Sequence, residues 1–418
     1  MKDPDFMNII AHGASELEQY IEQHFIDSNG LLYSFLDSST DAPPTAETFR
    51  GNPGKEWKDW KIGDFTQAEH AAYENFGMVT YSFGSAMLLK YQLTGDPEAL
   101  KIVRRTLNSV WHVAEIGKEL EFGYLPKIYG NRFSKQTSTD QYLYLLNFLD
   151  EYRRTDVCTA EERAKIEELI IAAVEFWRKR DYRYTYFIFE NMKWPPLRFP
   201  SFLALLYNVT GDCKYLLEAE EIIADNISYM PENSAFRHRH LTDGEKTSGE
   251  QVILNLCDRV SMDTLNAALY LRNAPESKFA CVWQSNMMQM ALEGLRVMSD
   301  DGQCYISTFY NLKDHTLRRA DNFGHDSDHG ARTGWSTMIL RGCMMAAAEI
   351  PGFRSEMIAR AEDILSKFDN IKKFNYINEE DIERINPAYH FKCRFISGDS
   401  VAQGLWSYYL LQKLKNMQ

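Results

Sequence analysis

Apolar stretches alternate along the chain with amphipathic stretches that carry more charge. The segment ENFGMVTYSFGSAMLLKYQLTGD (74–96) is apolar almost all round and ends at Thr-Gly-Asp, and SFLALLYNVTGD (201–212) ends in the same way. A glycine after a helix supplies a left-handed C-cap, and the following aspartate caps the next helix. Each TGD therefore predicts a tight turn from an apolar, buried helix to an amphipathic helix with one face toward solvent.

Five such helix pairs can be traced, with first helices beginning near residues 66, 138, 196, 258 and 332. A sixth apolar helix is predicted within 397–414, and the amphipathic N-terminal segment 8–25 is otherwise without a partner. Pairing these two segments closes a ring. The expected fold is all-α, an (α/α)6 toroid of six inner and six outer helices whose N-terminal helix closes the ring, in a single domain over 1–418.

The connections between these helices differ systematically in length. Inner-to-outer turns are short, whereas outer-to-inner connections are long, so the long loops gather at the end where the inner helices begin. Long loops on a rigid scaffold commonly carry function, and helix N-termini favour bound anions. Two stretches, FGYLPKIYG (122–130) and YRYTYFIFE (182–190), are expected as short strands within the loops.

Composition narrows the class of partner. A net charge of −13 without a Lys/Arg stripe argues against nucleic acid or an acidic membrane surface. The 13% aromatic content suits either a concave ligand site or a large core. Seven scattered cysteines without a CxxC motif are expected as reduced thiols. No signal-peptide core is recognised at the N-terminus, so the expected compartment is cytoplasmic or periplasmic, because a removed signal would leave the same sequence.

Two aspartates open apolar inner helices. Asp140 is followed on one face by Tyr144 and Asn147, at i+4 and i+7, and Asp263 begins a second helix in a similar way. Both could simply cap their helices. Because both are expected at the loop-rich end, they could instead point into one cavity as a pair of carboxylates for acid–base chemistry.

Three further residues are expected near these aspartates. Glu74 in the first inner helix is a candidate to face the cavity, or a solvated glutamate favoured by the helix dipole. Trp194 beside Arg198 would offer a stacking platform and an anion clamp for an acidic sugar, although a packed loop tryptophan fits equally well. Tyr144 completes the group as a substrate-binding residue on the Asp140 face.

The stretch GHDSDHGARTGW (324–335) is dense in polar chemistry. Its glycines disfavour the regular helix that would align two histidines on a metal, and three convergent ligands are not evident. We therefore expect no metal and no cofactor. Arg332 could hold a carboxylate, Trp335 could stack on a sugar ring, and His325 or His329 could transfer a proton or donate a hydrogen bond. A structural loop is the alternative.

Three stretches carry a family resemblance: SMDTLNAALYL (261–271), ARTGWSTMILRGCMMAAAEIPG (331–352) and SGDSVAQGLWSYYLL (397–411). They resemble the six-hairpin, (α/α)6-toroid glycosidase superfamily, and most of all unsaturated uronyl and rhamnogalacturonyl hydrolases. Thr333-Gly334-Trp335 stands where that family has Gly-Asn-Gly-Trp. Asp140 matches the position of the family's catalytic aspartate better than Asp263 does.

The resemblance implies a glycoside hydrolase that acts on a uronic-acid-containing oligosaccharide. An aspartate, Asp140 or Asp263, would protonate an unsaturated uronyl double bond and then activate water. One alternative is a polysaccharide lyase on the same toroid, with His329 and Arg332 among its reacting groups. Another is a non-catalytic glycan-binding protein. The expected partner is an oligosaccharide, with no nucleic acid and no membrane, and the oligomeric state is left open.

Overall fold

The computed structural model describes most of the chain. The residues outside the description are 1–3, 51–64, 187–188, 227–250, 256, 298–303, 306, 312–316, 320–331, 334–335, 369, 377–381, 384–389 and 391–392. Among the described residues, no helix is both long and apolar enough to cross a membrane.

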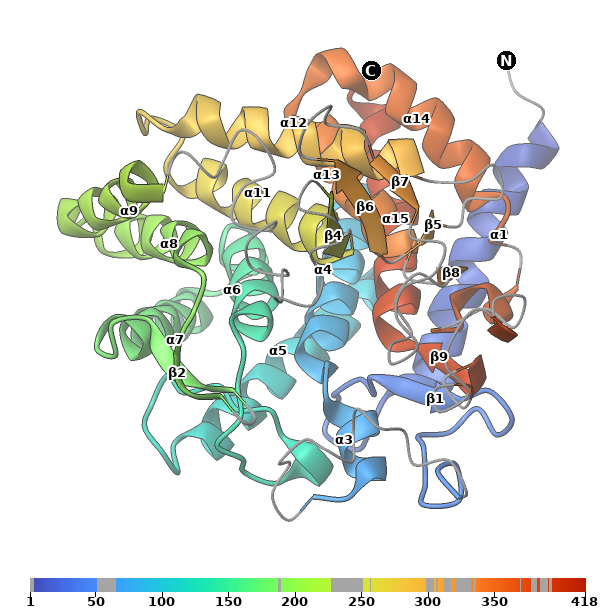
Figure 1. The fold of residues 1–418 in the computed structure, drawn as a ribbon, viewed down its shortest axis with the longest axis horizontal. Coiled ribbons are helices and arrows are strands. Elements are labelled where there is room, and N and C mark those ends of the chain that lie inside the picture. Colours follow the sequence, from blue (N-terminus) through green and yellow to red (C-terminus); the bar gives the residue numbers. More distant parts are fainter. Residues whose placement is uncertain are drawn as a thin grey trace.

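Six helices form an inner ring. Each one contacts the next in chain order, and the last contacts the first, which closes the ring (Figure 1). Their bounds are α4 (Phe76–Thr94), α6 (Thr139–Arg153), α8 (Pro200–Thr210), α11 (Asp263–Asn273), α13 (Ser336–Glu349) and α15 (Gly398–Asn416).

An outer layer of helices packs on the inner ring, one outer helix to each inner helix. Its members are α5 (Pro97–Gly117), α7 (Ala160–Arg178), α9 (Cys213–Asn226), α12 (Ala280–Val297), α14 (Pro351–Leu365) and α1 (Pro4–Tyr20). Helix α1 continues as the π-helical turn η1 (Ile21–Phe25) and packs on α15. The all-α (α/α)6 toroid with an N-terminal closing helix is therefore confirmed.

The short turns form as their residues dictate. Gly95 and Gly211 both have φ of 71°, the left-handed conformation that favours glycine after a helix. Asp96 then accepts a hydrogen bond from the backbone of Glu98 at 2.9 Å, and Asp212 accepts one from Lys214 at 3.0 Å. The inner helix is thus stopped and the outer helix started within two residues.

Four inner helices begin later than expected. Short helical turns, η3 (Pro196–Arg198) and η5 (Cys257–Met262), occupy the expected starts of α8 and α11, and the other two helices differ more. The segment near residue 66 forms a separate short helix, α3 (Gln67–Tyr73). The backbone leaves the helical conformation at Asn75, and α4 starts at the next residue. The helix expected from residue 332 starts only at Ser336. Arg332 lies instead in strand β8 (Arg332–Thr333), which pairs with β5 (Cys304–Tyr305) and so satisfies its backbone before the helix begins.

Short antiparallel strands fill the long connections. The stretch 182–190, expected as one short strand, contains β2 (Arg183–Tyr186) and the start of β3 (Phe189–Lys193), which pair as an antiparallel hairpin. The stretch 122–130 is not a strand: it is irregular and ends in the 3₁₀ turn η2 (Tyr129–Asn131). The remaining described strands are β1 (Phe35–Asp37), β4 (Gln251–Asn255), β6 (Ser307–Asn311), β7 (Leu317–Arg319) and β9 (Phe395–Ser397).

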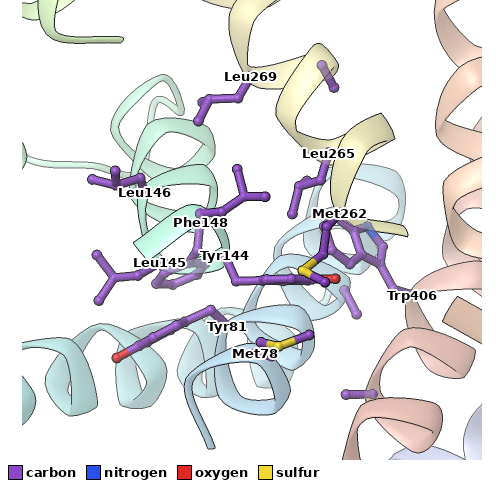
Figure 2. Packing of buried hydrophobic residues seen from close by; sticks show 14 of the residues in the cluster. Met78, Tyr81, Tyr144, Leu145, Leu146, Phe148, Met262, Leu265, Leu269 and Trp406 are labelled. Carbon is purple, nitrogen blue, oxygen red and sulfur yellow. The ribbon is translucent and has the colours of Figure 1, made fainter. Parts of the chain in front are cut away.

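The interior of the ring is filled with side chains. Figure 2 shows Tyr144 of α6 reaching toward Met262 and Trp406, with Met78 of α4 below it. All four are at most 5% exposed. Met262 ends the π-helical turn η5 (Cys257–Met262), which leads directly into α11. Residues from four elements therefore meet inside the ring and belong to one continuous core.

Candidate active site at the N-terminal end of the inner helices

Asp140 lies in the first turn of α6, and 28% of its side chain is exposed. Its Oδ1 is 3.5 Å from Nη2 of Arg198. Arg198 belongs to the 3₁₀ turn η3 (Pro196–Arg198), just ahead of α8, and is only 4% exposed. The structure therefore places a solvent-reachable carboxylate against a buried guanidinium, at the loop-rich end of the ring.

Asp263 opens α11 and is 5% exposed. The residue before it, Met262, places its Sδ 3.8 Å from Nη2 of Arg198. The same nitrogen of Arg198 thus approaches the first turn of α6 on one side and the start of α11 on the other. The structure therefore brings Asp140 and Arg198 into direct contact. Asp263 lies next to this pair because Met262, the residue before it, contacts Arg198.

Glu74 lies at the end of α3 and pairs with a lysine that sequence reasoning missed. Lys127 donates from Nζ to the backbone oxygen of Glu74 at 2.7 Å and also to its carboxylate. Gln141, which follows Asp140, donates to the same backbone oxygen at 3.4 Å. Lys127 is 1% exposed. Its signal in the sequence was a single lysine in the otherwise apolar stretch YLPKIYG.

Tyr144 is buried one turn after Asp140, where its hydroxyl accepts a hydrogen bond from Nη2 of Arg341 at 2.9 Å. Arg341 is fully buried in α13 and also donates to the backbone oxygen of Ser261 at 2.8 Å. Burial raises the pKa of Tyr144 although the charge of Arg341 opposes the rise, and burial lowers the pKa of Arg341. Sequence reasoning missed Arg341, although it is the one charged residue in the stretch 336–348.

Trp194 packs among aromatic rings. Its ring centroid is 5.7 Å from that of Trp177 and 5.3 Å from that of Tyr186, both nearly edge-on, and the residue is 7% exposed. The ammonium of Lys127 lies 5.8 Å from the Tyr186 centroid, so these rings border the Glu74 pair. These contacts are those of a packed loop tryptophan.

The other expected site residues are placed as follows. His325, His329 and Trp335 lie outside the described residues, and Arg332 is described only through its backbone in β8. Asp399 lies in the first turn of α15 and accepts a hydrogen bond from Nδ2 of Asn75 at 3.1 Å. Within the described part of the chain, no three His, Cys, Asp or Glu side chains are grouped as a metal site.

A second polar cluster lies at the opposite end of α6, around the fully buried Asp150. Arg272 of α11 reaches its Oδ2 at 2.6 Å, and Arg153 and Arg154 reach its Oδ1 at 2.8 and 3.0 Å. Burial alone would raise the pKa of Asp150, but the three arginines hold it below its ordinary value. The cluster joins α6 to α11 at the end that carries the short turns.

Comparison with known proteins gives matches at the level of structure. No family model and no curated protein matches the sequence. A D-mannose isomerase superposes with a TM-score of 0.55 at 9% identity, over 99% of each chain. Cellobiose 2-epimerase from Bacillus thermoamylovorans B4167 gives 0.52 at 11% identity, over 97% of this chain and 99% of its own. A glycosyl hydrolase family 88 protein from Bacteroides vulgatus gives 0.51 at 11%, over 98% and 99%.

These likenesses define a class of fold. The chain has the (α/α)6 toroid fold of these structures, so the fold that the sequence resemblance implied is confirmed. This fold is shared by hydrolases, isomerases and epimerases of sugars, and it does not by itself select one chemistry.

Proposed function

We propose that the protein is a glycoside hydrolase that acts on a uronic-acid-containing oligosaccharide, with Asp140 as general acid and base. One observation carries the proposal. Asp140 is a partly exposed carboxylate held by buried Arg198 at the end of the ring where the inner helices begin, beside the start of the Asp263 helix. Helix N-termini and a guanidinium at that end favour an anionic sugar.

The reaction we propose follows from the resemblance. Asp140, in its acid form, donates its proton to one carbon of an unsaturated uronyl double bond. The resulting carboxylate then accepts a proton from water as the water oxygen bonds to the other carbon. The hydrated sugar collapses and releases its glycosidic partner. In an ordinary inverting hydrolase, by contrast, Asp140 and Asp263 would divide the acid and base roles between them.

The test follows the ultraviolet absorbance of unsaturated uronyl oligosaccharides. The wild-type protein is expected to bleach this absorbance, and Asp140→Asn is expected to lower kcat/KM by roughly 10²–10⁴-fold because the proton donor is lost. Asp263→Asn is measured beside it. The matched control is Asp212→Asn, since Asp212 caps α9 in a short turn at the other end of the ring and asparagine caps equally well.

The outcomes separate the alternatives. Full activity in both Asp140→Asn and Asp263→Asn would sink the carboxylate mechanism. A gain in absorbance from saturated substrates would identify a lyase, and binding without turnover would identify a glycan-binding protein.

A second function is favoured by the comparisons. A D-mannose isomerase and a cellobiose 2-epimerase each match at least 97% of this chain. Isomerases and epimerases move a proton at carbon, which also requires positioned acid and base groups. The test incubates aldoses and cellobiose with the protein in D₂O and follows deuterium entering carbon-bound positions by NMR. Deuterium incorporation without loss of uronyl absorbance would replace the hydrolase proposal.

A further inference from the structure

Three arginines from different hairpins meet one face of α6. Arg198 contacts Asp140, Arg341 contacts Tyr144, and Arg272 contacts both Asn147 and Asp150. The four α6 residues are three or four positions apart, so they form a single stripe along the helix. We call Arg198, Arg341 and Arg272 the arginine column.

The arginine column joins α6 to the segment that contains α11. Arg198 contacts Met262 at the end of the ring where the inner helices begin, and Arg341 donates to the backbone oxygen of Ser261. Arg272 belongs to α11 itself. Each level of the column therefore connects the helix that carries Asp140 with the segment that leads into or contains Asp263.

Arg341 makes the middle one of the three connections between α6 and the α11 segment, and its hydrogen-bond partners are neutral groups. Its Nη2 serves both Tyr144 and Ser261, and its Nε donates to Oε1 of Gln403 at 3.0 Å. Its Nη1 lies 2.9 Å from Sδ of Met345. Within the described residues, none of its hydrogen-bond partners is a carboxylate. A buried cation of this kind is costly for stability, and an apolar group of similar size would often serve the fold as well.

The geometry of Arg341 bears on both aspartates. Tyr144 is one turn from Asp140 on α6, and Ser261 is two residues ahead of Asp263. The planar guanidinium also lies 5.7 Å from the Tyr144 ring centroid and 5.1 Å from that of Trp406, which restricts its rotation. One rigid group thus fixes the separation of the two elements directly beneath the candidate site.

We propose that Arg341, acting through Tyr144 and the Ser261 carbonyl, is a positioning residue that fixes Asp140 relative to Asp263. This inference rests on the proposed function of the two aspartates. Catalysis needs such fixing, because a displacement of about 1 Å at reacting groups can cost roughly 100-fold in rate.

The first variant is Tyr144→Phe, which removes only the hydroxyl that accepts from Arg341. Its matched control is Tyr81→Phe. Tyr81 is an equally buried tyrosine of an inner helix, stacked on Phe148, and its hydroxyl has no hydrogen-bond partner among the described residues (Figure 2). We expect Tyr144→Phe to lower kcat about tenfold or more with KM within about twofold. Tyr81→Phe is expected to keep both constants.

The second variant, Arg341→Lys, keeps the positive charge but loses the planar fork. A single ammonium cannot hold the hydroxyl, the carbonyl and the glutamine in one plane. We expect a loss of kcat and a displaced pH–rate profile, with KM again nearly unchanged. Equal kinetics and equal pH profiles in wild type, Tyr144→Phe and Arg341→Lys would overturn the inference.

A measurement without turnover separates this inference from the proposed function. Aspartate labelled with ¹³C at the carboxyl carbon is incorporated, the Asp140 and Asp263 signals are assigned from the two Asn variants, and both are titrated. Positioning predicts that Tyr144→Phe shifts the Asp140 titration whereas Tyr81→Phe does not. If the wild type is inactive yet this shift occurs, the proposed function fails and the positioning stands. If the two tyrosine variants titrate alike, the positioning fails.

Discussion

Asp150 is a buried carboxylate that neighbouring arginines stabilise in its charged form. It is fully buried at the far end of α6, and its two oxygens are shared among three arginines and the amide of Asn273. A buried carboxylate that loses its partners is strongly destabilising, and buried arginines that lose their carboxylate are equally so.

We predict that Asp150→Asn lowers the free energy of unfolding by about 3–5 kcal/mol near neutral pH, because it leaves three arginines without their carboxylate. The pKa of Asp150 is lowered from the ordinary 3.8, so its contribution is complete above that value and is lost as the pH falls through and below it. Urea unfolding from pH 7 downward should show wild type and variant converging in acid.

The control for this experiment is Asp363→Asn. Asp363 pairs with Arg360 and Lys367 on the surface, where its side chain is 47% exposed, so its loss should cost little. A constant gap between wild type and Asp150→Asn at every pH would contradict the electrostatic explanation.

Residues of the site differ in how far the sequence could reveal them. Asp140 was predicted because an acidic residue at the start of an apolar helix stands out in the pattern. Arg341 and Lys127 were missed although each is the one charged residue in an apolar stretch, because that local signal does not show which partner would stabilise a buried cation. Their partners lie 197 and 53 residues away in the sequence, so only the folded chain shows why their burial is tolerated.

At the scale of elements, close packing of α13 on η5 depends on a glycine. A Cβ at Gly342 would lie 2.4 Å from the backbone oxygen of Val260 and 2.8 Å from Oγ1 of Thr264. Backbone cannot move aside as a flexible side chain can, so the two elements would be forced apart beside Arg341.

We predict that Gly342→Ala lowers stability by about 1–3 kcal/mol. Gly352→Ala is the matched variant: Gly352 is in the first turn of α14, and a Cβ there meets nothing within 4 Å. That change is expected to be neutral or to stabilise by up to about 1 kcal/mol, because alanine favours helix more than glycine does. Thermal unfolding of both variants checks the pair, and equal shifts would refute the close-packing argument.

The hairpins could be predicted because apolar periodicity and TGD turns are local signals. The break between α3 and α4 could not, because the capping box of Thr66 and Glu69 starts a helix that stops only where Glu74 meets Lys127. The start of α13 was also placed too early, because the pairing of β8 with β5 depends on residues almost 30 positions upstream.

At the scale of the whole molecule, one glutamate joins the closing elements of the ring. Glu18 of α1 accepts hydrogen bonds from Lys90 of α4 at 2.8 Å and from Tyr409 of α15 at 2.9 Å. Burial and the nearby Glu18 raise the pKa of Tyr409, so the tyrosine stays a donor over the ordinary pH range. The N-terminal helix is thereby tied to the first and last inner helices together.

We predict that Glu18→Ala lowers the free energy of unfolding by about 1–3 kcal/mol, because it leaves the partly buried Tyr409 hydroxyl without its acceptor and leaves Lys90 paired with Asp96 alone, at 2.9 Å. Glu98→Ala removes an exposed pair with Lys101, whose side chains are 67% and 71% exposed, and should change stability by less than about 1 kcal/mol. Denaturant unfolding compares them. A loss no larger in Glu18→Ala than in Glu98→Ala would show that the contact does not stabilise the closure.

Ring closure could be predicted from the sequence, because the helical segments 8–25 and 397–414 were the two left without a hairpin partner. The direct contact between α6 and α11, which are not consecutive in the inner ring, did not follow, since it depends on how the helices pack in the folded chain. The arginine column comes from that contact. The sequence could therefore suggest that Asp140 and Asp263 lie at one end of the ring, but it could not reveal the arginines that link their helices.

The contact between α4 and α15 has a consequence for synthesis on the ribosome. Asn75 and Asp399, which are hydrogen-bonded across this contact, are separated by 324 residues. At about 5–20 residues per second, α4 waits roughly 15–65 s for the helix that covers it. Throughout that interval the nascent chain displays the apolar lining of an unfinished ring, and chaperone occupancy should peak just before α15 emerges from the exit tunnel.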